Sequence, residues 1–372
     1  MKNKMMKKVL ATVLTASMTF ALAACGSSTT AESESSEAAS EVEPEVATEE
    51  AVDPEAVDAE GTETEAADTD SEAKDLKIAV VKQLDHASLD EIANAITAEL
   101  DAIAADNGIT IEYEVYSGQN DQTTIKQITD QAVADGVDAI VPIATLAAQV
   151  ATVSAEETQT PVVYAAISDP VSAELTGIDY VTGTSDALNT EFILDMMIAQ
   201  NPDVDKVGIL YSLSETNSQT PVADAKAYLD EKGIAYSEQT AATNDEVVAA
   251  ASALIAEGVD AIFTPTDNVI MAAELAIYED LANAGIPHYT GADSFVRNGA
   301  YATCGVNYTD LGTKTADLAY EACTSGMDSM DDYYLMDGGI ITVNTETAAT
   351  LGLDYSVFAD MGELVEVVTS EE

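Results

Sequence analysis

Six segments of this sequence place small polar side chains directly after short apolar runs. Each segment carries hydroxyls, amides or carboxylates, and none contains lysine or arginine. Hydroxyls and amides both donate and accept hydrogen bonds, whereas carboxylates accept them. The segments are 83–88, 144–149, 166–170, 212–218, 264–268 and 291–295. The candidate ligand-binding residues within them are Gln83, His86, Thr145, Gln149, Ser168, Asp169, Asn217, Ser218, Thr266, Asp267, Asn268 and Asp293.

This combination of side chains suits a small zwitterion such as an α-amino acid. Several segments precede expected helices, whose unpaired N–H groups favour a carboxylate. Asp169, Asp267 and Asp293 are candidates for the partner of an ammonium group, because two buried charges must each be paired. Arg297 is the nearby cation. Each residue alone has an ordinary alternative as a helix cap or turn former, but the set as a whole favours binding.

The region from residue 76 onward alternates β-rich apolar runs with amphipathic stretches. Residues 76–81 predict a strand, and residues 88–107 predict a helix with Ile92, Ile96 and Leu100 on one face. This alternation predicts a parallel sheet covered by helices. Ligands of such sheets bind beyond the carboxyl ends of the strands, so the six segments should converge. Further expected strands are 109–116, 139–141, 162–166, 206–210, 300–305 and 340–344, and further helices are 122–135, 146–154 and 308–324.

The same pattern occurs twice along the chain. Three landmarks recur in the same order, at offsets of 129, 122 and 126 residues. Ordered recurrence at similar offsets indicates an internal duplication. The pairs are KIAVV (77–81) with KVGIL (206–210), GVDAI (136–140) with GVDAI (258–262), and TPVV (160–163) with IPHY (286–289).

The duplication predicts an α/β fold with two similar doubly wound parallel-sheet lobes. We expect residues 76–184 and 291–327 in the first lobe, and residues 185–290 and 328–368 in the second. The chain would then cross between the lobes more than twice. Several crossovers form a hinge, and hinged lobes can close around a ligand.

The N-terminus has the features of a secretory signal. Four lysines lie within the first eight residues, and an apolar run leads to Leu22-Ala23-Ala24-Cys25. We interpret residues 1–24 as a signal peptide and Cys25 as a lipidation site resembling a bacterial lipobox; an ordinary signal peptide with a chance cysteine is the alternative. Residues 25–75 carry eighteen acidic residues and one lysine, which predicts a disordered tether. An acidic interaction tail is the other interpretation.

Charge and composition exclude several classes of function. A net charge of −55 opposes binding to nucleic acid and to anionic lipid surfaces. No metal-spaced cluster, phosphate loop or nucleophile elbow occurs, so neither a metal nor a cofactor is expected and we interpret the protein as a non-enzyme. A Ser/His/Asp triad through His86 is the alternative. Cys304 and Cys323 could pair or remain as thiols.

An ordered series of motifs resembles a known family. The region from Leu76 to about Leu353 resembles the ABC transporter substrate-binding family whose best-described ligands are tryptophan and other aromatic amino acids, with a type I periplasmic-binding-protein fold. Two positions depart from the family pattern, Ala87 and Leu146, where proline is usual. The motifs are HASLD (86–90), ATLAAQ (144–149), SDPV (168–171), VGILY (207–211), NS (217–218), PTDN (265–268), DS (293–294), GA (299–300), GVNY (305–308) and LG (311–312).

The resemblance implies a binding lipoprotein at the extracytoplasmic face of a bacterial membrane that serves an ABC permease and its ATPase. It also implies that Thr145, Asn217, Ser218, Asp267 and Asp293 contact the ligand backbone. Other ligands remain open, namely a sugar, a nucleoside or a peptide, as does a sensor role at a membrane receptor. The absence of tryptophan disfavours a sugar. Possible walls of a ring-binding slot are Tyr164, Tyr211, Phe295 and Tyr308.

Overall fold

The computed structural model describes residues 75–370, which lie within one compact unit, residues 68–372. The expected signal peptide, the Cys25 lipidation site and the tether, apart from Asp75, lie outside the described residues. Within residues 75–370, no helix is both long and apolar enough to span a membrane.

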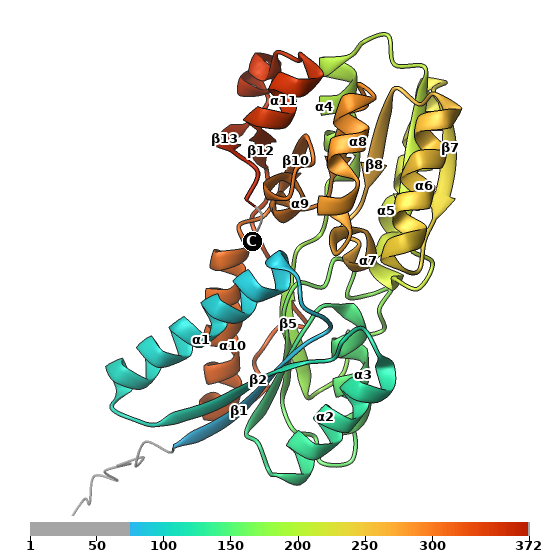
Figure 1. Ribbon diagram of the computed structural model, residues 1–372. Coiled ribbons are helices and arrows are strands. Elements are labelled where there is room, and N and C mark those ends of the chain that lie inside the picture. The colour runs from blue at the N-terminus through green and yellow to red at the C-terminus, as the bar shows by residue number, and fades with distance from the viewer. Residues whose placement is uncertain (1–74, 371–372) are drawn as a thin grey trace, which may run out of the picture. The chain divides into compact units, whose positions relative to one another are not determined.

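The first lobe is a six-stranded parallel sheet between two pairs of helices (Figure 1). Alternate residues of its strand β1 face opposite sides. Ile78 and Val80 pack in the cluster that contains α1 and α10, whereas Ala79 and Val81 pack with α2 and α3. Its strands, in sheet order, are β11 (Tyr334–Leu335), β5 (Val181–Ser185), β4 (Val162–Tyr164), β3 (Ala139–Ile143), β1 (Leu76–Lys82) and β2 (Ile111–Ser117). Its helices are α1 (Ala87–Asn107), α2 (Gln122–Ala134), α3 (Thr145–Ala155) and α10 (Tyr308–Ser325).

The second lobe is a seven-stranded sheet in which β10 and β12 pair antiparallel and all other neighbours pair parallel. Its strands, in sheet order, are β13 (Glu363–Val367), β12 (Ile340–Asn344), β10 (Ala302–Gly305), β9 (His288–Thr290), β8 (Ala261–Thr264), β6 (Lys206–Tyr211) and β7 (Ala235–Thr240). Its helices are α4 (Thr190–Gln200), α5 (Gln219–Lys232), α6 (Asn244–Glu257), α7 (Asn268–Met271), α8 (Tyr278–Asn283), α9 (Asp293–Arg297) and α11 (Thr345–Leu351).

The repeated GVDAI motif has the same structural role in both lobes. The carboxylate of Asp138 accepts a hydrogen bond from the backbone N–H of Lys77 at 2.9 Å, and that of Asp260 accepts one from Lys206 at 2.9 Å. Each aspartate therefore fixes the start of the strand that follows it, β3 or β8, to the first strand of its sheet. The preceding Gly136 and Gly258 share a φ of 67°, which glycine adopts with little strain. The structure thus confirms the expected pair of similar α/β lobes.

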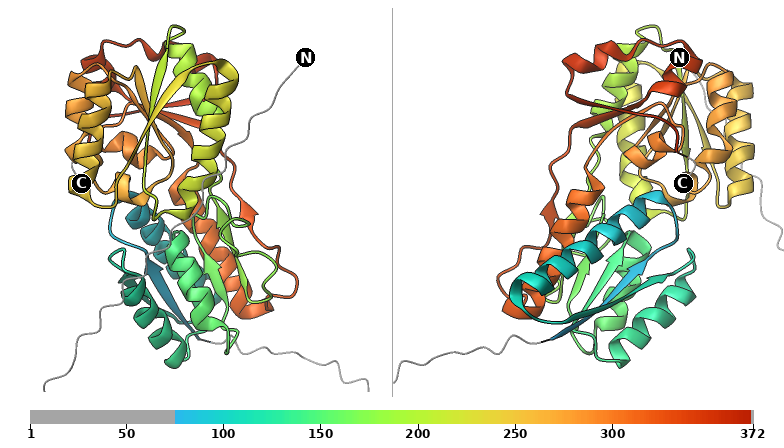
Figure 2. Two further views of the ribbon diagram at one scale, coloured as in Figure 1. Left: turned by 90° about the vertical axis from the view of Figure 1, so that its right-hand side faces the viewer. Right: turned by 60° about the vertical axis from the view of Figure 1, so that its left-hand side comes forward.

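The chain crosses between the lobes three times, after β5, after β10 and after β11 (Figure 2). This arrangement differs from the expected division in two places. Helix α9 and strand β10, expected in the first lobe as part of 291–327, belong to the second. Strand β11, expected in the second lobe, lies at the edge of the first sheet. Periodicity identifies a strand, but the choice of sheet depends on tertiary pairing, here that of β10 with β9 and β12.

The two cysteines of the described region lie in different lobes. Cys304 belongs to β10 and is buried, while Cys323 lies near the end of α10. No disulfide bond joins them.

Candidate ligand-binding site

A cavity lies between the lobes, at the carboxyl ends of the central strands, with room for about one water molecule (about 20 Å³). A larger ligand therefore requires the lining side chains or the lobes to move apart. All six of the expected segments contribute to its lining. The polar lining residues are His86, Ser88, Thr145, Ser168, Asp186, Asn217, Thr266, Asp267, Asn268 and Tyr308, and the apolar ones are Leu89, Ala144, Ala166, Met271, Ala292 and Phe295.

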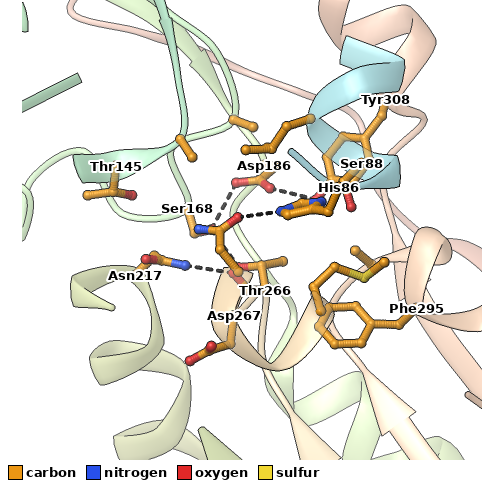
Figure 3. A pocket seen from close by; sticks show the side chains of 16 residues that line it. His86, Ser88, Thr145, Ser168, Asp186, Asn217, Thr266, Asp267, Phe295 and Tyr308 are labelled. Atoms are coloured by element: carbon orange, nitrogen blue, oxygen red, sulfur yellow. Dashed lines mark hydrogen bonds between the residues drawn. The ribbon is translucent and has the colours of Figure 1, made fainter. Parts of the chain in front are cut away.

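The structure brings seven of the twelve candidate residues to this cavity. Thr145 and Asn217 lie on one side of the drawn pocket, and Phe295 and Tyr308 lie on the other (Figure 3). The seven lining candidates are His86, Thr145, Ser168, Asn217, Thr266, Asp267 and Asn268; Gln83, Gln149, Asp169, Ser218 and Asp293 lie outside the lining.

The residues outside the lining support the loops or join the lobes. Gln149 Nε2 donates to the backbone oxygen of Ala173 at 3.1 Å. Ser218 Oγ donates to Asp267, and Asp293 pairs with Arg297 at 3.0 Å.

Several hydrogen bonds join the two lobes directly across the cleft. His86 Nε2 lies 3.0 Å from Asn268 Oδ1, and the hydroxyls of Ser168 and Thr266 lie 2.9 Å apart. Thr220 Oγ1 donates to Asp169 Oδ2 at 2.8 Å. The hydroxyls of Ser88 and Ser294 are also in contact. Side chains from opposite lobes meet in this way only when the cleft is closed, so the structure is a closed conformation.

Asp267 lines the cavity, but its carboxylate is already saturated. Oδ2 accepts from the backbone N–H of Ser212 and from Ser218 Oγ, both at 2.7 Å. Oδ1 accepts from the N–H groups of Val269 and Ile270 at 3.1 Å, which makes Asp267 the N-cap of α7. Burial raises the pKa of this carboxyl above its ordinary value, and the four donors oppose that rise. Its geometry fits a residue that fixes the loop.

Asp186 is a second lining carboxylate, and sequence analysis missed it. It follows strand β5 in the first inter-lobe segment and is 5% exposed. Ser168 Oγ donates to Oδ1 at 2.9 Å, and the phenol of Tyr308 donates to Oδ2 at 3.0 Å. A carboxylate has about four acceptor sites, so both oxygens retain the capacity to accept from a ligand. Burial raises the pKa of Asp186, which a bound cation would offset.

The N-terminus of α3 faces the same cavity. The first N–H groups of a helix have no partner within it, and here Gln83 Oε1 accepts that of Leu146 at 3.1 Å. The N-cap residue, Ala144, has φ 75° and ψ 163° and offers no capping side chain. Such a conformation is strained for alanine, and retained strain is common at binding sites. The start of α3, together with Thr145, therefore forms a receptor for an anionic group.

Two lining side chains have buried acceptor or donor atoms without a partner in the described region. These atoms are His86 Nδ1 and Asn217 Oδ1. Asn217 Nδ2 donates to the backbone oxygen of Thr266 at 2.6 Å, which orients its Oδ1 as an acceptor. A buried polar atom left unpaired is destabilising, so these atoms call for a ligand or water.

The charge of the lining is negative. It contains the carboxylates of Asp186 and Asp267 and, among the described residues, no lysine or arginine. Glu215, which is 3% exposed, lies behind the lining. Its pKa is raised to about 7, mainly by burial and to a lesser extent by the nearby Asp267 carboxylate. No group of three or more His, Cys, Asp or Glu in residues 75–370 could hold a metal ion. Such a lining favours a ligand with a cationic group.

Comparison with known proteins supports this interpretation of the fold and the cleft. A sequence model of the ABC transporter substrate binding protein family matches residues 77–356. The chain is 29% identical over 286 residues to a tyrosine-binding protein of Clostridioides difficile (strain R20291), covering 75% of this chain and 82% of the relative.

Two solved structures bear on the conformation. An ABC domain from Streptococcus pneumonia in complex with L-Trp has a TM-score of 0.70 and 28% identity, covering 78% of this chain and all of that one. The ligand-free, open structure of a substrate binding protein with adhesive properties from Clostridium difficile has a TM-score of 0.60 and 27% identity, over 79% of this chain and all of that one. The higher score for the complex agrees with the closed cleft. By its sequence and its fold, the chain belongs to the ABC transporter substrate-binding protein family.

Proposed function

We propose that this protein binds an aromatic α-amino acid between its lobes and delivers it to an ABC importer. The observation that carries the proposal is a single cavity with three distinct parts: a helix N-terminus whose N-cap residue offers no capping side chain, a carboxylate with spare acceptor capacity and an apolar end. These parts match the carboxylate, the ammonium group and the side chain of an amino acid. The relatives that bind tyrosine and L-Trp support the same ligand class.

The ligand carboxylate would lie at the N-terminus of α3. Thr145 is buried there, and its hydroxyl can donate alongside the helix N–H groups. The ammonium group would lie against Asp186, with Asn217 Oδ1 as a further acceptor. Pairing both charges offsets much of their desolvation.

The ligand side chain would occupy the apolar end of the cavity. Leu89 comes from the first lobe, whereas Met271, Ala292 and Phe295 come from the second. Because both lobes form this end, a bulky side chain contacts them together only after closure. Differential contact of this kind lets a ligand favour the closed state.

We further propose that the protein acts outside the cytoplasm, anchored through a lipidated Cys25, and that an ABC permease with its ATPase receives the ligand. The family assignment supports the transport role, and the signal-like sequence that ends at Cys25 supports the anchor. Metabolic labelling with a fatty-acid analogue tests the anchor. Label that persists on a Cys25→Ser variant would contradict it.

Isothermal titration calorimetry of the purified full-length protein tests the ligand class. The panel contains tryptophan, tyrosine, phenylalanine, leucine, a pentose, a hexose, a nucleoside and a dipeptide. We expect saturable binding of the aromatic amino acids. Binding of a sugar, nucleoside or dipeptide with no response to any amino acid would refute the proposal.

A further inference from the structure

Only one of the two ring nitrogens of His86 has a hydrogen-bond partner among residues 75–370. Its Nε2 contacts Asn268 Oδ1 at 3.0 Å, whereas its Nδ1 is buried with no partner among residues 75–370. The ring lines the cavity and lies toward Phe295 and Tyr308, away from Thr145 (Figure 3). This is the side at which the proposed function places the ligand side chain. Nδ1 is therefore positioned to contact that side chain.

A chain of hydrogen bonds behind the cavity determines which nitrogen carries the proton. Asn268 Nδ2 donates to Glu215 Oε2 at 2.7 Å, so its Oδ1 must be the atom that faces His86. A carbonyl oxygen accepts only, and therefore His86 Nε2 is the donor. Gln83 Nε2, from the first lobe, donates to Glu215 Oε1 at 2.9 Å and holds the carboxylate in place.

With its proton on Nε2, a neutral imidazole leaves Nδ1 as an acceptor. Burial is the largest influence on the ring and lowers the pKa of His86 to about 4. The ring is therefore neutral near neutral pH, and its buried lone pair needs a hydrogen-bond donor.

We infer that His86 Nδ1 makes the site select amino acids whose side chain carries a hydrogen-bond donor, such as a phenol O–H or an indole N–H. This inference rests on the proposed function and extends it to the choice among aromatic ligands. A ligand without a donor leaves Nδ1 buried and unpaired, which is unfavourable. Sites that hydrogen-bond a ligand group discriminate strongly against analogues that lack it.

A ligand series on the full-length wild-type protein tests the inference at about pH 8, where Glu215 is ionised. Tyrosine, tryptophan and 4-aminophenylalanine carry a donor; phenylalanine and 4-fluorophenylalanine do not. We expect each donor ligand to bind about tenfold or more tightly than phenylalanine. Equal affinities across the series would overturn the inference while leaving the proposed function intact. If no amino acid binds at all, both are overturned.

Two substitutions of His86 separate its two nitrogens. Glutamine in H86Q places an amide near the Nε2 position and removes the acceptor at Nδ1, whereas asparagine in H86N retains a polar atom near Nδ1. We expect the ratio of the phenylalanine Kd to the tyrosine Kd to fall toward one in H86Q, whatever the overall affinity of that variant, and to stay near the wild-type ratio in H86N. A tyrosine preference that survives in H86Q would overturn the inference.

Discussion

The phenol of Tyr308 donates a hydrogen bond to Asp186 Oδ2 at 3.0 Å, which ties together two of the three inter-lobe segments. Asp186 follows β5, at the point where the chain crosses from the first lobe to the second. Tyr308 begins α10, at the point where the chain has crossed back to the first lobe. The carboxylate that we assign to the ligand ammonium group is thus part of the hinge. A cation bound there acts on the same segments that bend during closure.

Replacing Asp186 by asparagine should weaken amino-acid binding. The Asp186→Asn variant loses the charge that faces the ammonium group, and we expect a loss of about 1.5–3 kcal/mol, roughly tenfold to 150-fold in Kd. Calorimetric titration with tryptophan measures it. Asp130→Asn, on the exposed face of α2, is the matched control and should bind as the wild type does. An unchanged Kd in Asp186→Asn would remove Asp186 from the site.

Replacing Asp267 by asparagine should instead reduce the stability of the fold. Its carboxylate accepts four internal hydrogen bonds. An amide retains a single acceptor oxygen, so we expect the free energy of unfolding to fall by about 2–4 kcal/mol. Urea denaturation without ligand measures this. Unchanged stability combined with lost tryptophan binding would assign the ammonium group to Asp267 instead.

Ligand affinity should rise as the pH falls through about 7. In the closed form burial and Asp267 raise the pKa of Glu215 to about 7. Opening exposes Glu215 to solvent, which removes much of the burial effect and returns its pKa toward the ordinary value, so the closed form binds more protons at this carboxyl. Linkage through Glu215 then favours closure at lower pH, by about tenfold in total between pH 8 and pH 6.

Phenylalanine is the appropriate ligand for this measurement because it has no side-chain donor for His86. The Glu215→Gln variant should lose this gain and instead bind more weakly as the pH falls, because burial in the closed form lowers the pKa of His86 to about 4. A wild-type profile with the same slope as that of Glu215→Gln would contradict the assignment to Glu215.

A disulfide between the lobes should trap the closed form. Ser88 and Ser294 lie in opposite lobes with their hydroxyls in contact, and disulfide formation requires side chains that approach this closely. In a Ser88→Cys/Ser294→Cys variant, tryptophan should accelerate formation of the cross-link under mild oxidation, as followed by mobility on non-reducing gels. Each single variant controls for reaction with Cys304 or Cys323. A rate that ligand leaves unchanged would argue against closure on the ligand.

Sequence reasoning predicted the fold well because the duplication and the strand–helix alternation are local patterns. The GVDAI motif occurs in both lobes, and in each its aspartate accepts a hydrogen bond from the first strand of the sheet. The sequence could not show which lobe contains each part of residues 291–327. The lobe of β10 depends on its pairing with β9 and β12, and β12 is distant in sequence.

The loops of the site were predictable, but the roles of single residues were not. Asp186 was missed because the short strand before it, VTGTS, has few bulky apolar residues and was not predicted. It could have been found as the polar residue that ends this strand. Asp267 shows the converse, since a sequence cannot distinguish a helix cap from a ligand contact when both use aspartate.

A crystal structure of the protein grown with tryptophan tests the central claim most directly. We predict that the ligand nitrogen lies within hydrogen-bond distance of Asp186, with its carboxylate at the start of α3 and its ring against Phe295. A ligand with its carboxylate directed at Asp186, or one bound outside the cleft, would contradict this account.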